Sequence, residues 1–117
     1  MAFHYESYVA DTHNDVLGRV LNGDDILTRS DKGHTDLPRL QEGGIDLEVF
    51  VIWVNPDEYV PVGSYDQANK MIDALEEICN RAPDKIAIPL TFDDLLINDT
   101  RGKISAMIGV EGGHPLE

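Results

Sequence analysis

The chain has 117 residues, with 9 Lys and Arg against 22 Asp and Glu, so its formal net charge is −13 when the histidines are neutral. Hydrophobic residues make up 42% of the chain and charged residues 26%, which is typical of a folded globular protein. An acidic surface without a basic patch repels phosphate groups, so we expect no nucleic acid and no anionic membrane surface as partner.

The sequence shows no transmembrane or secretory segment. Its longest apolar run, residues 49–54, is far shorter than the ~20 residues that a membrane-spanning helix needs. Residues 1–8 lack the basic start and apolar stretch of a signal peptide, so a cytoplasmic location is expected. The single cysteine, Cys79, cannot form an internal disulfide, and its place in an apolar series favours a core position over a nucleophile.

Three segments are predicted to be buried parallel strands. The first, residues 8–10, is a short apolar entry into the polar cluster 11–15. The second, residues 45–54, is rich in β-branched and aromatic side chains and lies between a Gly-Gly and an Asn-Pro pair. The third, residues 104–110, has small and β-branched residues and ends at Glu111.

A long amphipathic helix is predicted between the second and third strands. Ser64 can cap it with Gln67 three residues later, and Pro83 ends it. Its apolar positions recur at spacings of three and four, at Ala68, Met71, Ile72, Leu75, Ile78, Cys79 and Ala82.

A second capping signature, Thr91 with Asp94, predicts a short helix that turns Phe92, Leu95 and Leu96 toward the core. Strands that alternate with helices in this way indicate an α/β fold built from βα units around a parallel sheet. In such folds, functional residues gather at the carboxyl ends of the strands.

Two polar clusters, residues 11–15 and 111–114, follow predicted strands. Because side chains alternate along a strand, His13 and Asp15 point to the same side and could bind one cation. An imidazole with a carboxylate suits zinc, manganese or iron. The alternative is that these polar residues cap the following helix.

Glu111 is expected to be buried at the end of an apolar strand, where an anion needs a counter-charge. A metal ion would supply it, and a salt bridge to Arg or Lys is the alternative. The glycines at 112–113 allow either close approach to a ligand or a plain turn. His114 could contact a substrate or hydrogen-bond the backbone.

Other candidate residues are assigned structural places. His4 and His34 have no partner at ligand spacing and are expected in surface or loop positions. The acidic pairs at 24–25 and 93–94 are interpreted as solvated turn and helix-start charges. Trp53 is expected to pack in the core, and the alternative is that it lines a pocket.

Three motifs together resemble the amino-terminal third of the membrane (renal) dipeptidase family, peptidase family M19. They are Asp-Thr-His-Asn-Asp at 11–15, His-Thr-Asp-Leu-Pro-Arg-Leu at 34–40 followed by Gly-Gly at 43–44, and Ile-Gly-Val-Glu-Gly-Gly-His at 108–114. The order and approximate spacing of all three match, and the resemblance covers essentially the whole chain. The third motif is the most specific.

The resemblance implies a zinc-dependent dipeptidase with an amidohydrolase-like (β/α)8 TIM barrel. By motif, His13 and Asp15 would bind one zinc ion, and Glu111, the implied catalytic residue, would bridge it to a second. His114 would be a candidate for contact with the dipeptide substrate. In the family, a hydroxide between the two zinc ions attacks the scissile carbonyl, and a complete active site holds two zinc ions.

A complete barrel takes at least ~200 residues, so residues 1–117 are expected to form the amino-terminal three or so βα units of one incomplete barrel domain. The family's other zinc ligands and its acid/base residue would lie beyond them. The expected partners are therefore the remainder of the barrel or a complementing chain, with a homodimer also open, and the segment alone is expected to be inactive. The alternatives are another amidohydrolase-type metal-dependent hydrolase, or a non-catalytic fragment that acts only as an interaction module.

Overall fold

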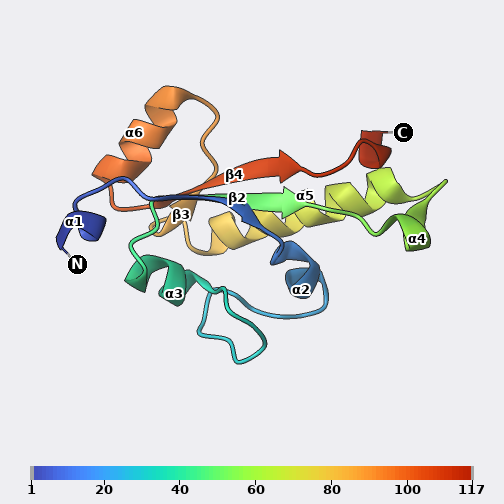
Figure 1. Cartoon of the computed structure of the whole chain (residues 1–117), viewed down its shortest axis with the longest axis horizontal. Helices are drawn as coiled ribbons and strands as arrows, with labels where there is room; N and C mark the ends of the chain where they lie inside the picture. The colour runs from blue at the N-terminus through green and yellow to red at the C-terminus, as the bar shows by residue number, and fades with distance from the viewer. Residues whose placement is uncertain (1, 117) are drawn as a thin grey trace.

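The computed structural model describes residues 2–116, which form a parallel four-stranded sheet with helices packed against it (Figure 1). The strands are β1 (Ala10–Asn14), β2 (Leu47–Ile52), β3 (Ile86–Ala87) and β4 (Ile104–Val110). The helices are α1 (Ala2–Tyr5), α2 (Leu17–Leu21), α3 (Leu37–Glu42), α4 (Pro56–Tyr59), α5 (Ser64–Arg81), α6 (Phe92–Thr100) and the 3-10 helix η1 (His114–Leu116). The strand order is β1-β2-β4-β3, and every pair is parallel. The predicted α/β class is confirmed.

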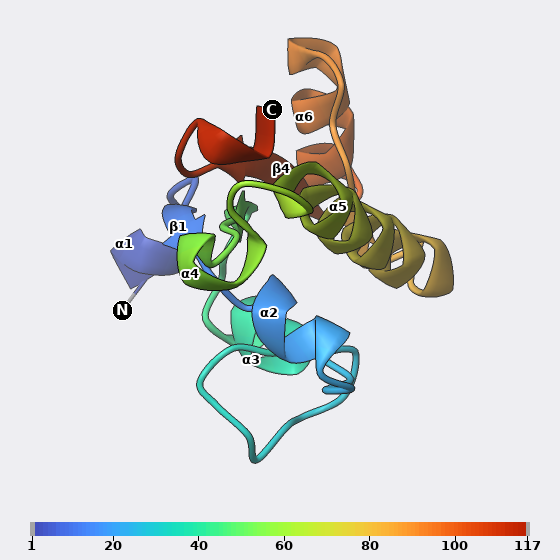
Figure 2. The same ribbon diagram turned by 90° about the vertical axis from the view of Figure 1, so that its right-hand side faces the viewer.

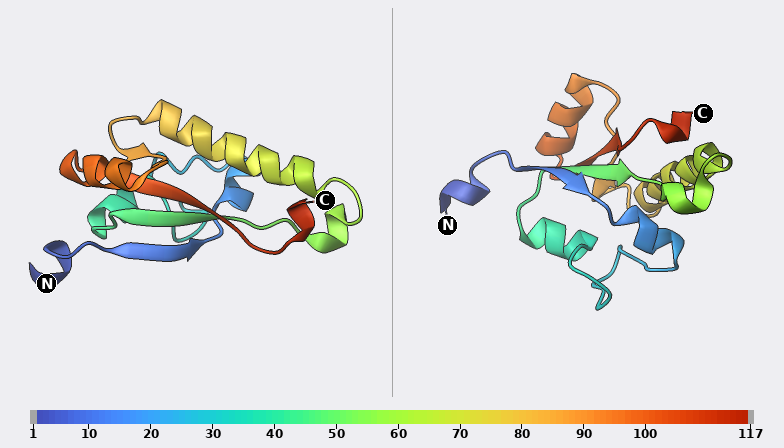
Figure 3. Two further views of the ribbon diagram at one scale, coloured as in Figure 1. Left: turned by 90° about the horizontal axis from the view of Figure 1, so that it is seen from above. Right: turned by 45° about the vertical axis from the view of Figure 1, so that its right-hand side comes forward.

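The core lies between the sheet and the helices α2, α3 and α5. Phe50 and Ile52 of β2 are fully buried there, because alternate side chains of a strand point to the same face. Leu75 of α5 packs into the same cluster, together with residues of α2 and α3. Helix α5 runs along this face of the sheet (Figure 3). Its apolar residues, spaced three and four positions apart, form a stripe that covers the strands.

The first strand differs from its prediction in position and in burial. The polar residues expected after the strand, 11–14, form most of β1 itself, and four of its five residues are exposed. The physical reason is the place of β1 at the edge of the sheet formed by residues 2–116, where β2 is its one neighbour. The prediction of a buried first strand was wrong.

The second and third predicted strands correspond to β2 and β4, and one short strand was missed. Strand β3 has two residues and pairs with the start of β4. A strand this short has no alternating pattern for the sequence to reveal.

The long predicted helix is confirmed as α5, with a correction at its start. Gly63, at φ +102°, occupies the N-cap position, and Ser64 is the first helical residue. The Ser64 hydroxyl is buried and donates a hydrogen bond to the Tyr59 carbonyl at 3.2 Å. Ser64 therefore binds the preceding turn instead of capping the helix.

Helix α6 has the predicted capping box between Thr91 and Asp94, but its apolar residues were placed wrongly. Phe92 is 70% exposed, Leu96 is also exposed and Leu95 is half-buried. The buried residue of α6 is Asn98, whose side-chain amide donates a hydrogen bond to the Ser105 hydroxyl of β4 at 3.0 Å. The helix thus contacts the sheet through a polar residue.

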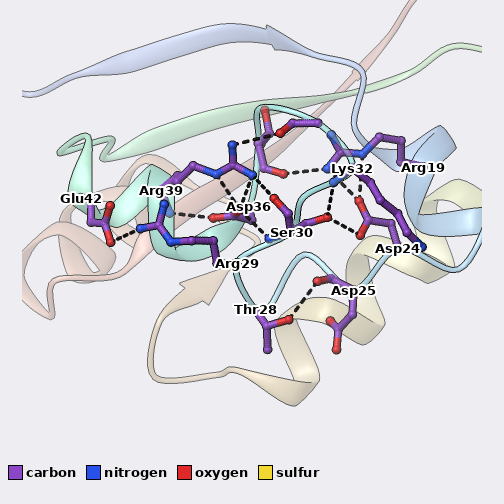
Figure 4. Close-up of polar contacts among 12 residues, drawn as sticks. Arg19, Asp24, Asp25, Thr28, Arg29, Ser30, Lys32, Asp36, Arg39 and Glu42 are labelled. Atoms are coloured by element: carbon purple, nitrogen blue, oxygen red, sulfur yellow. Dashed lines mark hydrogen bonds and ion pairs between the residues drawn. The ribbon is translucent and has the colours of Figure 1, made fainter.

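The 34–40 motif forms the start of α3 and fixes the long loop before it (Figure 4). Asp36 is fully buried, caps α3 by accepting a hydrogen bond from the Arg39 backbone at 2.8 Å, and forms an ion pair with the Arg39 side chain. Asp24, expected to be a solvated turn residue, is buried and paired with Arg19 at 2.8 Å. The neighbouring Asp25 is exposed and pairs with Arg81 of α5.

Candidate metal centre

The end of β1 has an irregular register that sets the direction of its side chains. Asp11 lies opposite Glu48 of β2, and Asn14 lies opposite Phe50. Two residues of β1, Thr12 and His13, therefore face a single residue of β2, which is the pattern of a β-bulge. Bulges of this kind change the direction in which a side chain points.

His13, Asp15 and Glu111 come together at the carboxyl edge of the sheet, which faces the viewer in Figure 2. His13 Nε2 lies 3.2 Å from Asp15 Oδ2 and 3.3 Å from Glu111 Oε2. One ligand atom from each of the three side chains lies within 4.8 Å of the others. The structure thus brings Glu111 to His13, 98 positions earlier in the chain, because parallel strands end at the same edge of a sheet.

The donor set fits a divalent transition metal. One imidazole nitrogen and two carboxylate oxygens are ligands that zinc, manganese and iron accept. Within residues 2–116, neither Asp15 nor Glu111 forms an ion pair with Lys or Arg, so the salt-bridge alternative for Glu111 finds no support. The capping alternative is not supported for His13 or Asp15: Val16 is the N-cap of α2 and has no side-chain cap, and the residue of the 11–15 cluster that bonds the start of α2 is Asn14, which accepts from the Val16 N–H.

The three side chains are about half exposed, at 54% for His13, 62% for Asp15 and 50% for Glu111. The expectation that Glu111 is buried was therefore wrong. Only the first half of β4 is covered, and Val110, immediately before Glu111, is exposed. The three side chains of the cluster line an open cavity of about 510 Å³.

Trp53 and Met71 line the same cavity. Trp53 is 44% exposed, so the prediction that it packs in the core was wrong, and the alternative that it lines a pocket agrees with the structure. Trp53 follows the last residue of β2, and alternation places its side chain on the same face as those of Val49 and Val51. The buried Phe50 and Ile52 point to the opposite face. Trp53 therefore gives the cavity an apolar wall beside the polar side chains of the cluster.

His114 hydrogen-bonds the backbone instead of entering the cavity. Its Nε2 lies 2.7 Å from the Val54 carbonyl oxygen, to which it donates. Gly112 has φ +85°, and a Cβ atom there would come within 2.8 Å of the His114 ring. A glycine is therefore required for the turn that brings His114 back onto the chain after β2.

The remaining histidines and the cysteine lie away from the cluster. His4 is exposed, with Nε2 at 2.6 Å from the Gly43 carbonyl oxygen, and His34 is exposed. Cys79 is half-buried against the core, and burial raises the pKa of its thiol to about 11. The interpretation of Cys79 as a core residue agrees with this environment.

Glu48 was not singled out in the sequence. It lies on the helix-facing side of the central strand β2, is fully buried, and neither carboxylate oxygen has a hydrogen-bond partner among the described residues. Burial raises the pKa of Glu48 to about 7; the nearby Asn14 amide lowers it, and the negative charge of Asp11 raises it. Its only sequence signal is a glutamate in phase with Phe50 and Ile52 in an apolar strand.

Comparison with known proteins gives the family. The sequence model of the membrane dipeptidase family, peptidase family M19, matches residues 1–117. Among solved structures, the chain is similar to dipeptidase AC, a metallopeptidase of family M19, with 26% sequence identity and a TM-score of 0.79. It also has the fold of the probable dipeptidase PvdM from Pseudomonas aeruginosa, with 19% identity and a TM-score of 0.75.

The fold and the residue cluster define part of an α/β barrel of the metallohydrolase type, as the sequence predicted. The chain belongs to the membrane dipeptidase family, peptidase family M19. The match to dipeptidase AC covers 92% of this chain and 36% of that protein. The match to PvdM covers 98% of this chain and 31% of that protein. The chain thus corresponds to about a third of each dipeptidase. In residues 2–116, no helix combines the length and the apolar character needed to cross a bilayer.

Proposed function

We propose that this segment supplies the first half of the metal site of a zinc-dependent dipeptidase. The observation that carries the proposal is the cluster of His13, Asp15 and Glu111, with ligand atoms within 4.8 Å at the carboxyl edge of a parallel sheet. Membership of a metallopeptidase family supports it.

Each residue has a defined part in this proposal. His13 Nε2 and Asp15 Oδ2 would hold one zinc ion, and the Glu111 carboxylate would bridge that ion to a second. Bound zinc would polarise the scissile carbonyl of a dipeptide and lower the pKa of a coordinated water molecule. The half-exposed ligands leave room for further ligands from the remainder of the barrel or from a complementing chain.

The cavity also suits a small peptide substrate. The three polar ligands lie on one side, and Trp53 and Met71 provide apolar contact. A dipeptide could thus present its peptide bond to the ligand cluster while an apolar side chain packs on the indole. We propose that hydrolysis requires the complete barrel and that residues 1–117 alone are inactive.

The test uses the full-length protein and compares His13→Ala and Asp15→Ala with His34→Ala, a control that removes an exposed histidine outside the cluster. Metal content is measured by plasma emission spectrometry, and hydrolysis is measured with a panel of dipeptides. We expect both cluster variants to lose bound metal and turnover, while the control keeps them. Metal and turnover retained in both cluster variants would refute the proposal. Hydrolysis of other amides or esters but no dipeptide would favour a different amidohydrolase activity.

A further inference from the structure

The bulge in β1 determines whether His13 can reach the metal site. In a regular register continued from Asp11 and Glu48, His13 would lie opposite Phe50 and share its buried face. The extra residue gives that place to Asn14 and turns His13 toward Asp15 and Glu111. A bulge leaves a residue unpaired in the ladder, so hydrogen bonds other than those of the ladder hold this geometry, and one of them runs from the His13 N–H to the Asp11 carboxylate at 3.1 Å.

Asn14 makes two such contacts on the face opposite the ligands. Its side-chain oxygen accepts a hydrogen bond from the Val16 backbone N–H at 3.1 Å, and its amide nitrogen donates to the Thr35 hydroxyl at 3.2 Å. The Val16 N–H can only donate, so it fixes the amide orientation and directs the NH2 group to Thr35. Asn14 is thereby tied both to the start of α2 and to the loop before α3.

Thr35 is itself held in place. Its carbonyl accepts a hydrogen bond from the Arg19 guanidinium at 2.8 Å, and the same guanidinium pairs with buried Asp24 (Figure 4). Ser30 donates to the other oxygen of Asp24 at 2.7 Å. Thr35, which binds the Asn14 amide, therefore belongs to a connected polar network.

We propose that the hydrogen bond between Asn14 and Thr35 is a positioning device for the metal ligands, which keeps the β1 bulge in the geometry that His13 and Asp15 need. This inference rests on the proposed metal site and goes beyond it, because neither Asn14 nor Thr35 belongs to the cluster of His13, Asp15 and Glu111. The loss of an outer-shell contact of a metal site typically lowers metal affinity by about 10- to 100-fold. Since this contact acts through the backbone, we expect the lower end of that range.

The experiment measures Co²⁺ and Zn²⁺ affinity of the full-length protein by competition with a chromophoric chelator, together with the visible d–d spectrum of the Co²⁺ form. Thr35→Val removes the hydroxyl with little change of shape, and Thr35→Ser keeps it. Thr28→Val is the matched control, because Thr28 is in the same loop and its hydroxyl, among residues 2–116, hydrogen-bonds the Asp25 carbonyl and no part of the Asn14 network. Thermal unfolding of the metal-free variants shows whether each one folds.

We expect Thr35→Val to weaken metal binding about tenfold and to change the Co²⁺ spectrum, while Thr35→Ser and Thr28→Val behave as wild type. The double variant Asn14→Ala/Thr35→Val should lose no more metal affinity than the weaker-binding of its two single variants, because both substitutions remove the same hydrogen bond. Unchanged affinity and spectrum in Thr35→Val would overturn the inference alone, as would an equal loss in Thr28→Val. A wild-type protein that binds neither metal would overturn the proposed function and this inference with it.

Discussion

Glu48 gives a prediction that can be worked out from the structure. Its carboxyl is fully buried on the central strand, and neither oxygen has a hydrogen-bond partner in the part of the chain described. Glu48→Gln keeps the size of the side chain and its unsatisfied polar atoms but removes the charge. The substitution therefore isolates the free-energy cost of ionising a buried acid.

The sign follows from proton binding. The pKa of Glu48 rises from its ordinary value of 4.5 to about 7 on folding, so the folded protein binds the proton more tightly than the unfolded chain. Stability contributed by this group falls as the pH rises from 4.5 to about 7 and stays low above that range. At about 1.36 kcal/mol for each pKa unit, the full cost is about 3 kcal/mol.

The assay is urea unfolding of the full-length protein between pH 4.5 and pH 8.5. Glu48→Gln should match wild type most closely near pH 4.5 and exceed it by up to about 3 kcal/mol above pH 7.5. Glu77→Gln, an exposed substitution on α5, should stay within about 0.5 kcal/mol of wild type. A Glu48→Gln difference that does not grow with pH would refute the reasoning.

Two further predictions concern the loop network and the core. Asp36→Asn should lower the free energy of unfolding in urea by about 3 kcal/mol. This value is the low end of the cost of breaking a buried ion pair, because the Arg39 side chain is partly exposed. A loss below about 1 kcal/mol would show that the ion pair does not stabilise the protein. Cys79, with its pKa at about 11, should be alkylated by iodoacetamide at pH 8 far more slowly than in urea, since only about one thiol in a thousand is ionised. Equal rates in the native and unfolded protein would contradict this environment.

The sequence predicted the features that depend on local periodicity. The apolar spacing of α5, the capping box of Thr91 and Asp94, and the β-branched runs of β2 and β4 are each specified by neighbouring residues. The approach of His13 to Glu111 could also be predicted, because the strand-end rule for parallel sheets needs only the chain order of strands. The capping box, however, did not predict which side of α6 meets the sheet, and Asn98 occupies that contact.

The bulge in β1 could not be predicted from the sequence. Simple alternation correctly puts His13 and Asp15 on one side, but it does not say which side faces the cavity. That choice depends on the extra residue between Asp11 and Asn14 and on the partner that Asn14 finds in Thr35, 21 residues away. A contact at that distance leaves no periodic signal in the sequence.

The predicted burial of Glu111 was wrong, and the buried Glu48 was overlooked, for a related reason. Glu111 follows an apolar strand and Glu48 lies inside one, so apolar neighbours alone would place both in the interior. Burial depends instead on what covers each position. Glu48 has β1 and β4 on either side and shares the helix-covered face, whereas Glu111 extends past the covered half of β4 into the open cavity. Burial favours the protonated form of the Glu48 carboxyl, whereas the exposed Glu111 carboxylate remains accessible to the metal ion that we propose, so one residue type meets two different environments within one sheet.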